Sequence, residues 1–96
     1  MPLFAVHALD RPNALALRLQ HYTAHRAFIE TDDLFSVDVV LSGPLQTPDG
    51  ETMIGSLFLI ESDSLEAVET FVNADPYALH EIWGTVSIQR FHRRKG

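Results

Sequence analysis

Cysteine is absent from the 96 residues, which excludes disulfide bonds, thiolate nucleophiles and cysteine-ligated zinc. No apolar run approaches the roughly 18–20 residues that span a bilayer, and the first residues lack the pattern of a signal peptide. Because both a membrane span and a signal peptide are missing, we expect a cytoplasmic protein. A glycine-rich phosphate loop and a dinucleotide fingerprint are also missing.

Basic residues are scarce outside the C-terminal end. Four of the seven lysines and arginines lie within residues 90–96, all 13 acidic residues precede them, and the formal net charge is −6. An acidic body repels phosphate, so we expect neither nucleic acid nor a membrane as a partner. The run Arg93-Arg94-Lys95 is too short to indicate a patch for either.

The remaining composition is that of a folded protein. The chain is 46% hydrophobic and 21% charged, which argues against disorder. Because domains usually run to about 100–150 residues, we expect residues 1–96 to form a single domain.

Hydrophobic periodicity predicts the element order β-α-β-β-α-β. The expected strands and helices cover, in chain order, residues 3–9, 14–34, 37–41, 52–61, 63–74 and 85–91. Asn13 is the expected N-cap of the first helix, and Asp63 with Glu66 fits the capping box of the second. This order predicts a ferredoxin-like α+β fold, with a four-stranded antiparallel sheet and both helices on one face.

Each expected helix has an apolar face. The residues predicted to be buried are Leu15, Leu19, Tyr22 and Ile29 in the first helix, and Leu65, Val68 and Phe71 or Val72 in the second. The strands are apolar on more than one side, at Val39, Leu41, Leu57, Leu59 and Ile88. Because a monomer rarely exposes such a face, we expect a homodimer whose sheets pack against each other.

The five histidines are the first candidates for chemistry. His21 and His25 are one helical turn apart and could share a divalent metal, but Tyr22 stands where the metalloprotease motif needs glutamate. We therefore expect no metal and no other cofactor. His25 alone is either a general acid–base residue or a half-buried histidine bonded to a carbonyl group.

Three further residues have both a functional and a structural interpretation. Asp75 could orient an imidazole or exchange protons, but a carboxylate before Pro76 is also a common helix N-cap. Arg18 could bind a substrate carboxylate, or it could be a solvated surface residue. Ser56 could donate a hydrogen bond into a pocket, although no nucleophile-elbow motif surrounds it.

Several segments together resemble the YciI-like (YCII-related) family of small dimeric α+β-barrel proteins. They are Ala8-Leu9-Asp10, Arg18 seven residues before His25, Ser42-Gly43-Pro44, Gly55-Ser56, Asn73-Ala74-Asp75-Pro76-Tyr77, and Val86, Ile88 and Phe91 in the last strand. The resemblance implies a pocket in which His25 and Asp75 form an acid–base pair, with Arg18, Ser56 and Tyr77 as candidates for binding substrate.

One branch of this family resembles a dehydrochlorinase acting on a chlorinated hydroxyquinol, which is proton transfer with elimination. The resemblance therefore implies a small-molecule lyase or isomerase that acts on an unidentified small ligand. The alternative is a non-catalytic module that binds a small ligand or a partner protein.

Two departures from the family pattern concern the rim of the expected pocket. Tyr22 replaces an arginine that many relatives have three residues before the histidine. Residues 31–36, Thr-Asp-Asp-Leu-Phe-Ser, contain none of the glycine that often ends the first helix of relatives.

Overall fold

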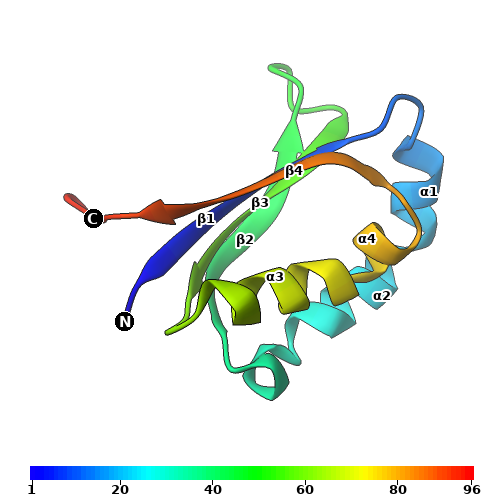
Figure 1. Ribbon diagram of the computed structural model, residues 1–96. Coiled ribbons are helices and arrows are strands. Elements are labelled where there is room, and N and C mark those ends of the chain that lie inside the picture. The colour runs from blue at the N-terminus through cyan, green and yellow to red at the C-terminus, as the bar shows by residue number, and fades with distance from the viewer.

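The computed structural model describes all 96 residues, and its helices cover one face of a four-stranded antiparallel sheet (Figure 1). The elements are, in chain order, β1 (Leu3–Asp10), α1 (Leu15–Gln20), α2 (Tyr22–Ile29), the 3₁₀ helix η1 (Asp32–Phe35), β2 (Asp38–Gln46), β3 (Met53–Glu61), α3 (Leu65–Ala74), α4 (Pro76–Leu79) and β4 (Trp83–Phe91). The predicted ferredoxin-like α+β fold is confirmed.

The sheet order is β2-β3-β1-β4, with β1 and β3 in the centre. Val6 of β1 lies between Phe58 of β3 and Ile88 of β4. Side chains alternate along β1, so Phe4, Val6 and Ala8 lie beneath the helices while their neighbours face the other side.

The core lies between this face of the sheet and the helices. Val68, Phe71 and Val72 of α3 are buried against it, as predicted, together with Ile60 of β3. Burying each such side chain contributes about 1.5–3 kcal/mol.

The continuous helix predicted over residues 14–34 is wrong. His21 adopts φ −101° and ψ 10° between α1 and α2, and α2 ends at Ile29. The Thr31 hydroxyl then donates to the Phe28 carbonyl (2.7 Å), and polar side chains that bond nearby backbone groups compete with a helix. Ser36 adopts the left-handed conformation (φ 59°) that glycine often supplies after a helix.

The predicted buried face of the first helix is also wrong. Leu15, Leu19 and Tyr22 are exposed, and Ile29 is half-buried, whereas Arg18 and His25 are 2% and 8% exposed. These two polar side chains face inward because buried carboxylates lie opposite them, as described below.

Strand β2 runs through the segment predicted to end it. Gly43 and Pro44 pair with Leu57 and Ser56, and the strand continues to Gln46. Because β2 is an edge strand, the missing N–H of Pro44 need not interrupt the ladder.

Helix caps and one strand start also differ from the prediction. Asn13 has φ 63° and does not cap α1, whose N-cap position is Ala14. Ser64 rather than Asp63 caps α3, because its hydroxyl accepts the Ala67 N–H (3.2 Å). This shift turns Leu65 outward, where it is 46% exposed. Strand β4 begins two residues early, at Trp83.

The sheet face opposite the helices is uncovered. Leu41, Leu57 and Leu59 lie there, and the first two are 51% and 38% exposed. Val39 and Ile88 instead pack against the core. No helix is long and apolar enough to cross a membrane.

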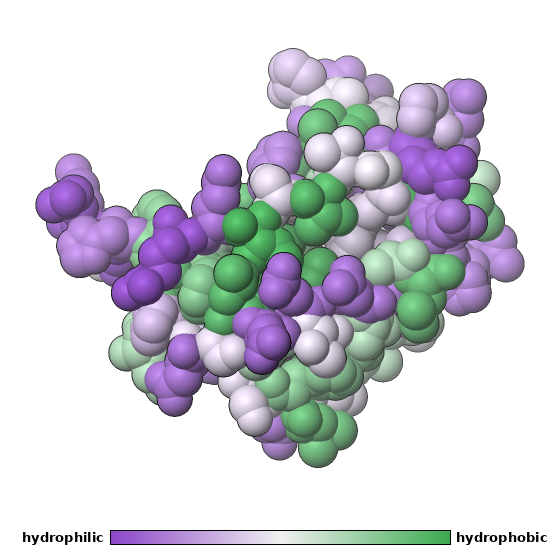
Figure 2. Space-filling model, in the orientation of Figure 1, coloured by the Kyte–Doolittle hydropathy of each residue, from purple (hydrophilic) through white to green (hydrophobic).

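Apolar and polar side chains lie next to one another on the face that Figure 2 shows, across the edge strand β4. Figure 2 shows a hydrophobic patch over the middle of β4, and hydrophilic surface where the chain ends at the left of the view. The segment after β4 is exposed and contains Arg93, Arg94 and Lys95.

Candidate active site

A cavity of about 290 Å³ lies between helices α1 and α2 and strands β2 and β3. Its wall includes Arg18, Tyr22, His25 and Arg26 on the helix side, and Ser56 on the sheet side. Further lining residues are Ile29, Glu30, Ser42, Gly43, Pro44 and Phe58. This size is at the lower end of small-molecule pockets.

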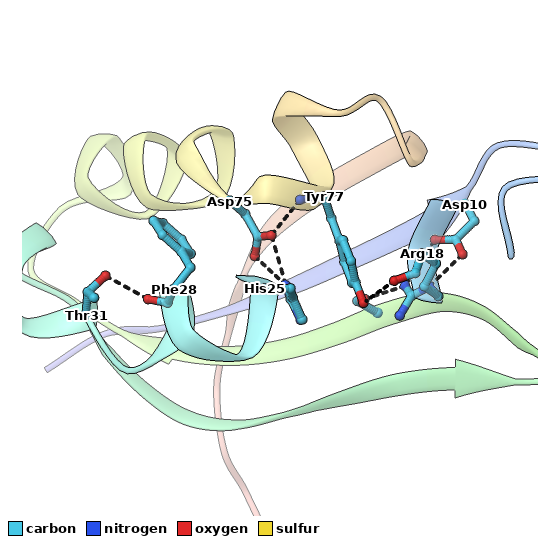
Figure 3. A network of polar contacts seen from close by, with 8 residues as sticks. Asp10, Arg18, His25, Phe28, Thr31, Asp75 and Tyr77 are labelled. Carbon is cyan, nitrogen blue, oxygen red and sulfur yellow. Dashed lines mark hydrogen bonds and ion pairs between the residues drawn. The ribbon is translucent and has the colours of Figure 1, made fainter. Parts of the chain in front are cut away.

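His25 is joined to Asp75 behind the cavity wall. Imidazole Nδ1 lies 2.9 Å from both carboxylate oxygens of Asp75, which is completely buried (Figure 3). An ionised carboxylate only accepts hydrogen bonds, so the imidazole donates its Nδ1–H. The Nε2 atom has no protein partner and carries the lone pair in this tautomer.

Asp75 serves as both a helix cap and the partner of His25. It precedes Pro76 at the start of α4, and its Oδ1 accepts the Tyr77 N–H at 2.8 Å. The cap fixes the carboxylate, and the carboxylate in turn fixes the plane of the imidazole. The two interpretations of Asp75 are therefore compatible.

Tyr77 stands between His25 and Arg18 (Figure 3). Its ring stacks on the imidazole, with 4.0 Å between centroids and 9° between planes, and the guanidinium carbon of Arg18 lies 4.6 Å from the same ring. Its hydroxyl donates to the Arg18 carbonyl at 3.2 Å. Burial raises the pKa of this phenol, opposed by the charge of Arg18, so it remains a neutral donor.

Arg18 is the second buried charge of the site. Its Nε and Nη2 donate to the two carboxylate oxygens of Asp10, at 2.7 and 3.1 Å, which is bidentate pairing. The Nη2 atom also donates to Ser56 Oγ at 2.7 Å. The Ser56 hydroxyl therefore keeps its own proton for another acceptor.

The candidate residues lie at two depths, some at the cavity surface and others buried behind it. Arg18, His25 and Ser56 line the cavity, whereas Asp75 and Tyr77 lie behind it and are fully buried. The two histidines considered for a metal have different partners, since His25 bonds to Asp75 and the His21 ring stacks on His80, 3.8 Å between centroids. No group of three potential metal-ligating side chains is present.

Two residues of the site were not predicted as site residues. Asp10 is the ion-pair partner of Arg18, and the sequence signal for it is the segment Ala8-Leu9-Asp10 at the end of β1, which was part of the family resemblance. Arg26 lines the cavity beside His25, and its four-residue spacing from Tyr22 predicts the contact that the two residues make.

The YCII-related domain family matches residues 2–92 of the chain. This protein belongs to the YCII-related family. It is 29% identical to protein YciI of Escherichia coli O6:H1 over 97 residues, covering 95% of this chain and 97% of the relative. Protein YciI of Shigella flexneri has the same identity and coverage.

Two solved structures are similar in fold. One is the 5-chloro-2-hydroxyhydroquinone dehydrochlorinase TftG of Burkholderia phenoliruptrix AC1100, in complex with 2,5-dihydroxybenzoquinone, with TM-score 0.82, 28% identity, and 94% of this chain and 93% of that chain covered. The other is a dimeric ferredoxin-like protein of unknown function from Bacteroides fragilis NCTC 9343, with TM-score 0.59, 18% identity, and 96% and 95% covered.

Proposed function

We propose that this YCII-related protein is a small-molecule lyase or isomerase in which the His25–Asp75 pair transfers protons. The observation that supports this most is the position of His25. Its Nδ1 is held by a fully buried carboxylate, while its ring lines a cavity. This arrangement is typical of a histidine kept in one tautomer for general base catalysis.

In the proposed reaction, His25 Nε2 removes a proton from the bound substrate. Asp75 stabilises the resulting imidazolium across the 2.9 Å contact and remains ionised. The same Nε2–H then returns the proton at another atom in an isomerisation, or releases it to solvent in an elimination. Asp75 and Tyr77 act as positioning residues, because neither lines the cavity.

Ser56 is the proposed donor to the developing oxyanion. Its Oγ already accepts a hydrogen bond from Arg18, which polarises the hydroxyl so that it donates more strongly toward the cavity. Arg18 therefore acts through Ser56, while its own charge is paired with Asp10.

Two observations support a substrate class: the small volume of the cavity and the activity of TftG, the dehydrochlorinase of similar fold. We propose a single hydroxylated ring, because the cavity is small and TftG acts on a chlorinated hydroxyhydroquinone. Dehydrochlorination is the loss of HCl, which requires a proton acceptor and a departing chloride. The proposed base supplies the first requirement.

Proton transfer can be tested without knowing the natural substrate. Purified protein is incubated in D₂O with a panel of hydroxylated and chlorinated rings; NMR reports deuterium incorporation and an electrode reports chloride release. We expect His25→Ala to lower turnover at least 100-fold, since general base catalysis contributes about 10²–10⁴-fold. His80→Ala is the matched control and should retain full turnover.

The outcome also distinguishes the alternative function. Ring compounds that bind to wild-type protein with no exchange or release would favour a non-catalytic binding module. A second readout is the imidazole ¹⁵N spectrum, in which we expect the Nδ1–H tautomer of His25 in wild-type protein and a mixture of tautomers in Asp75→Asn. A folded His25→Ala variant with wild-type turnover would contradict the proposed role.

We further propose that two copies of this chain pack their open sheet faces together. The exposed leucines Leu9, Leu41 and Leu57 on that face support this, since large apolar patches mark interfaces. The dimeric description of the Bacteroides fragilis protein with the same fold is consistent with it.

A further inference from the structure

The charged side chains that line the cavity influence which substrates can bind. Two arginines line the cavity, but they differ in their partners. Arg18 is buried and neutralised by Asp10, whereas Arg26 is fully exposed and forms no ion pair within 4 Å. Arg26 is therefore the one arginine of this cavity whose charge is available to a ligand.

Tyr22 holds Arg26 in place. Arg26 Nη1 donates to the Tyr22 hydroxyl at 2.9 Å, and the guanidinium carbon lies 5.6 Å from the centre of the same ring. One of the five guanidinium N–H donors is thus engaged, and the others have no protein acceptor. The planar donor edge matches the two oxygens of a carboxylate or of an ionised enolone.

We propose, on the basis of the function proposed above, that the substrate is a planar organic anion whose charged edge is bound by Arg26. The ring lies in the cavity, between His25 on the helix side and Ser56 on the sheet side. The anionic edge stays at the rim, where it can remain partly hydrated. Binding of this kind discriminates between an anion and a neutral ring of the same shape.

Glu30 provides an internal check on this assignment. It lines the same cavity one turn after Arg26 on the same side of the helix, and it forms no ion pair with Arg26 within 4 Å. An anion bound by Arg26 is repelled by Glu30. Neutralising these two residues must therefore change the affinity for an anion in opposite directions.

The test uses benzoate and benzamide, which have nearly the same shape but differ by one charge. Binding is measured by NMR chemical shifts and by fluorescence of Trp83, the single tryptophan of the chain, whose ring lies 6.3 Å from that of His25. We expect wild-type protein to prefer benzoate. Arg26→Gln should weaken benzoate binding about tenfold, the usual scale of a charge-assisted contact, and Glu30→Gln should strengthen it.

A second arm separates the two anionic edges. Ionised 2,5-dihydroxybenzoquinone is compared with its neutral dimethyl ether in wild-type protein, Arg26→Gln and Glu30→Gln. Preference for benzoate alone identifies a carboxylate ligand, and preference for the quinone anion alone identifies an enolate. Both results support recognition by Arg26, provided that the preference is lost in Arg26→Gln.

Arg93→Gln is the control for net charge, because it makes the same charge change in the exposed C-terminal segment. An equal loss in Arg93→Gln, a preference that survives Arg26→Gln, or binding of neither anion would overturn the inference. Turnover of a neutral substrate that depends on His25 would also overturn the inference about Arg26, but it would leave the proposed lyase or isomerase function intact. Anion-selective binding without turnover of any ring would instead keep this inference and reject the enzyme.

Discussion

Single residues connect the two buried pairs of the site, and Tyr77 contributes most of the connections. Its N–H holds Asp75, its ring stacks on His25 and its hydroxyl bonds to the Arg18 backbone. The raised pKa of this phenol predicts a pH dependence. The folded state keeps the proton longer than the unfolded chain, so the stability from the neutral phenol is complete below about pH 10. It is lost as the pH rises toward the folded-state pKa.

We therefore expect the free energy of unfolding to fall above pH 10 in wild-type protein, and to fall less in Tyr77→Phe. At neutral pH the variant should lose about 0.5–1.5 kcal/mol, the net value of one hydrogen bond. Urea unfolding between pH 7 and 11 measures both effects. Identical alkaline losses in the two proteins would contradict the assignment of that loss to Tyr77.

Arg18 and Asp10 form the second pair, and both side chains are nearly inaccessible. Arg18→Met leaves a buried carboxylate uncompensated, so we expect a loss of about 3–5 kcal/mol. The double variant Arg18→Met/Asp10→Leu should recover much of this loss, because no unpaired charge remains. Urea unfolding of the double-mutant cycle measures the coupling, and strictly additive losses would contradict a direct pair.

The elements could largely be predicted from the sequence, but the rotation of the first helix could not. Strand alternation and turn residues predicted β1, β3 and β4 to within two residues at either end. The hydrophobic period placed Leu15 and Leu19 inward because it treats polar residues as exposed. Arg18 and His25 reverse this, since their partners Asp10 and Asp75 come from other elements and sequence spacing does not show those contacts.

The candidate site could also be predicted from the sequence only in part. Residue type and spacing indicated His25, Asp75, Arg18 and Ser56 as candidates, and the family resemblance added Tyr77 and the pairing of His25 with Asp75. The structure brings all five together in one network. Which of them face the cavity depends on packing between α2, α4 and β3. That packing is a property of the folded chain, and it also places Arg26, which no motif indicated.

Strands β1 and β3 approach each other closely at Gly55. A Cβ atom added there would lie 2.4 Å from the Ala8 carbonyl oxygen, whereas one added at Gly43 of β2 meets nothing within 4 Å. We expect Gly55→Ala to destabilise the protein by about 1–3 kcal/mol, the range for overpacking, because backbone must move. Gly43→Ala should be neutral or stabilising by up to about 1 kcal/mol. Thermal unfolding of both variants tests this, and equal effects would contradict the close approach.

At the scale of the whole molecule, a single chain leaves part of its apolar sheet surface exposed to solvent. A protein of this size buries a smaller share of its surface on folding than a larger domain does, and the helices cover only one face of the sheet. In the proposed dimer, a second copy covers the leucines of the open face. Association of this kind would stabilise the folded state by mass action, so unfolding should depend on protein concentration.

We expect wild-type protein to elute as a dimer at micromolar concentration in size-exclusion chromatography with light scattering. Leu57→Lys, in the open face, should shift it to a monomer and lower its unfolding temperature, because a charge would be buried in an apolar interface. Leu34→Lys in η1 is the control, since Leu34 is more exposed but lies outside that face. The control should remain a dimer with an unchanged unfolding temperature. A wild-type monomer whose unfolding temperature is independent of concentration would reject the proposed sheet-to-sheet assembly, and the open face would then need a different occupant.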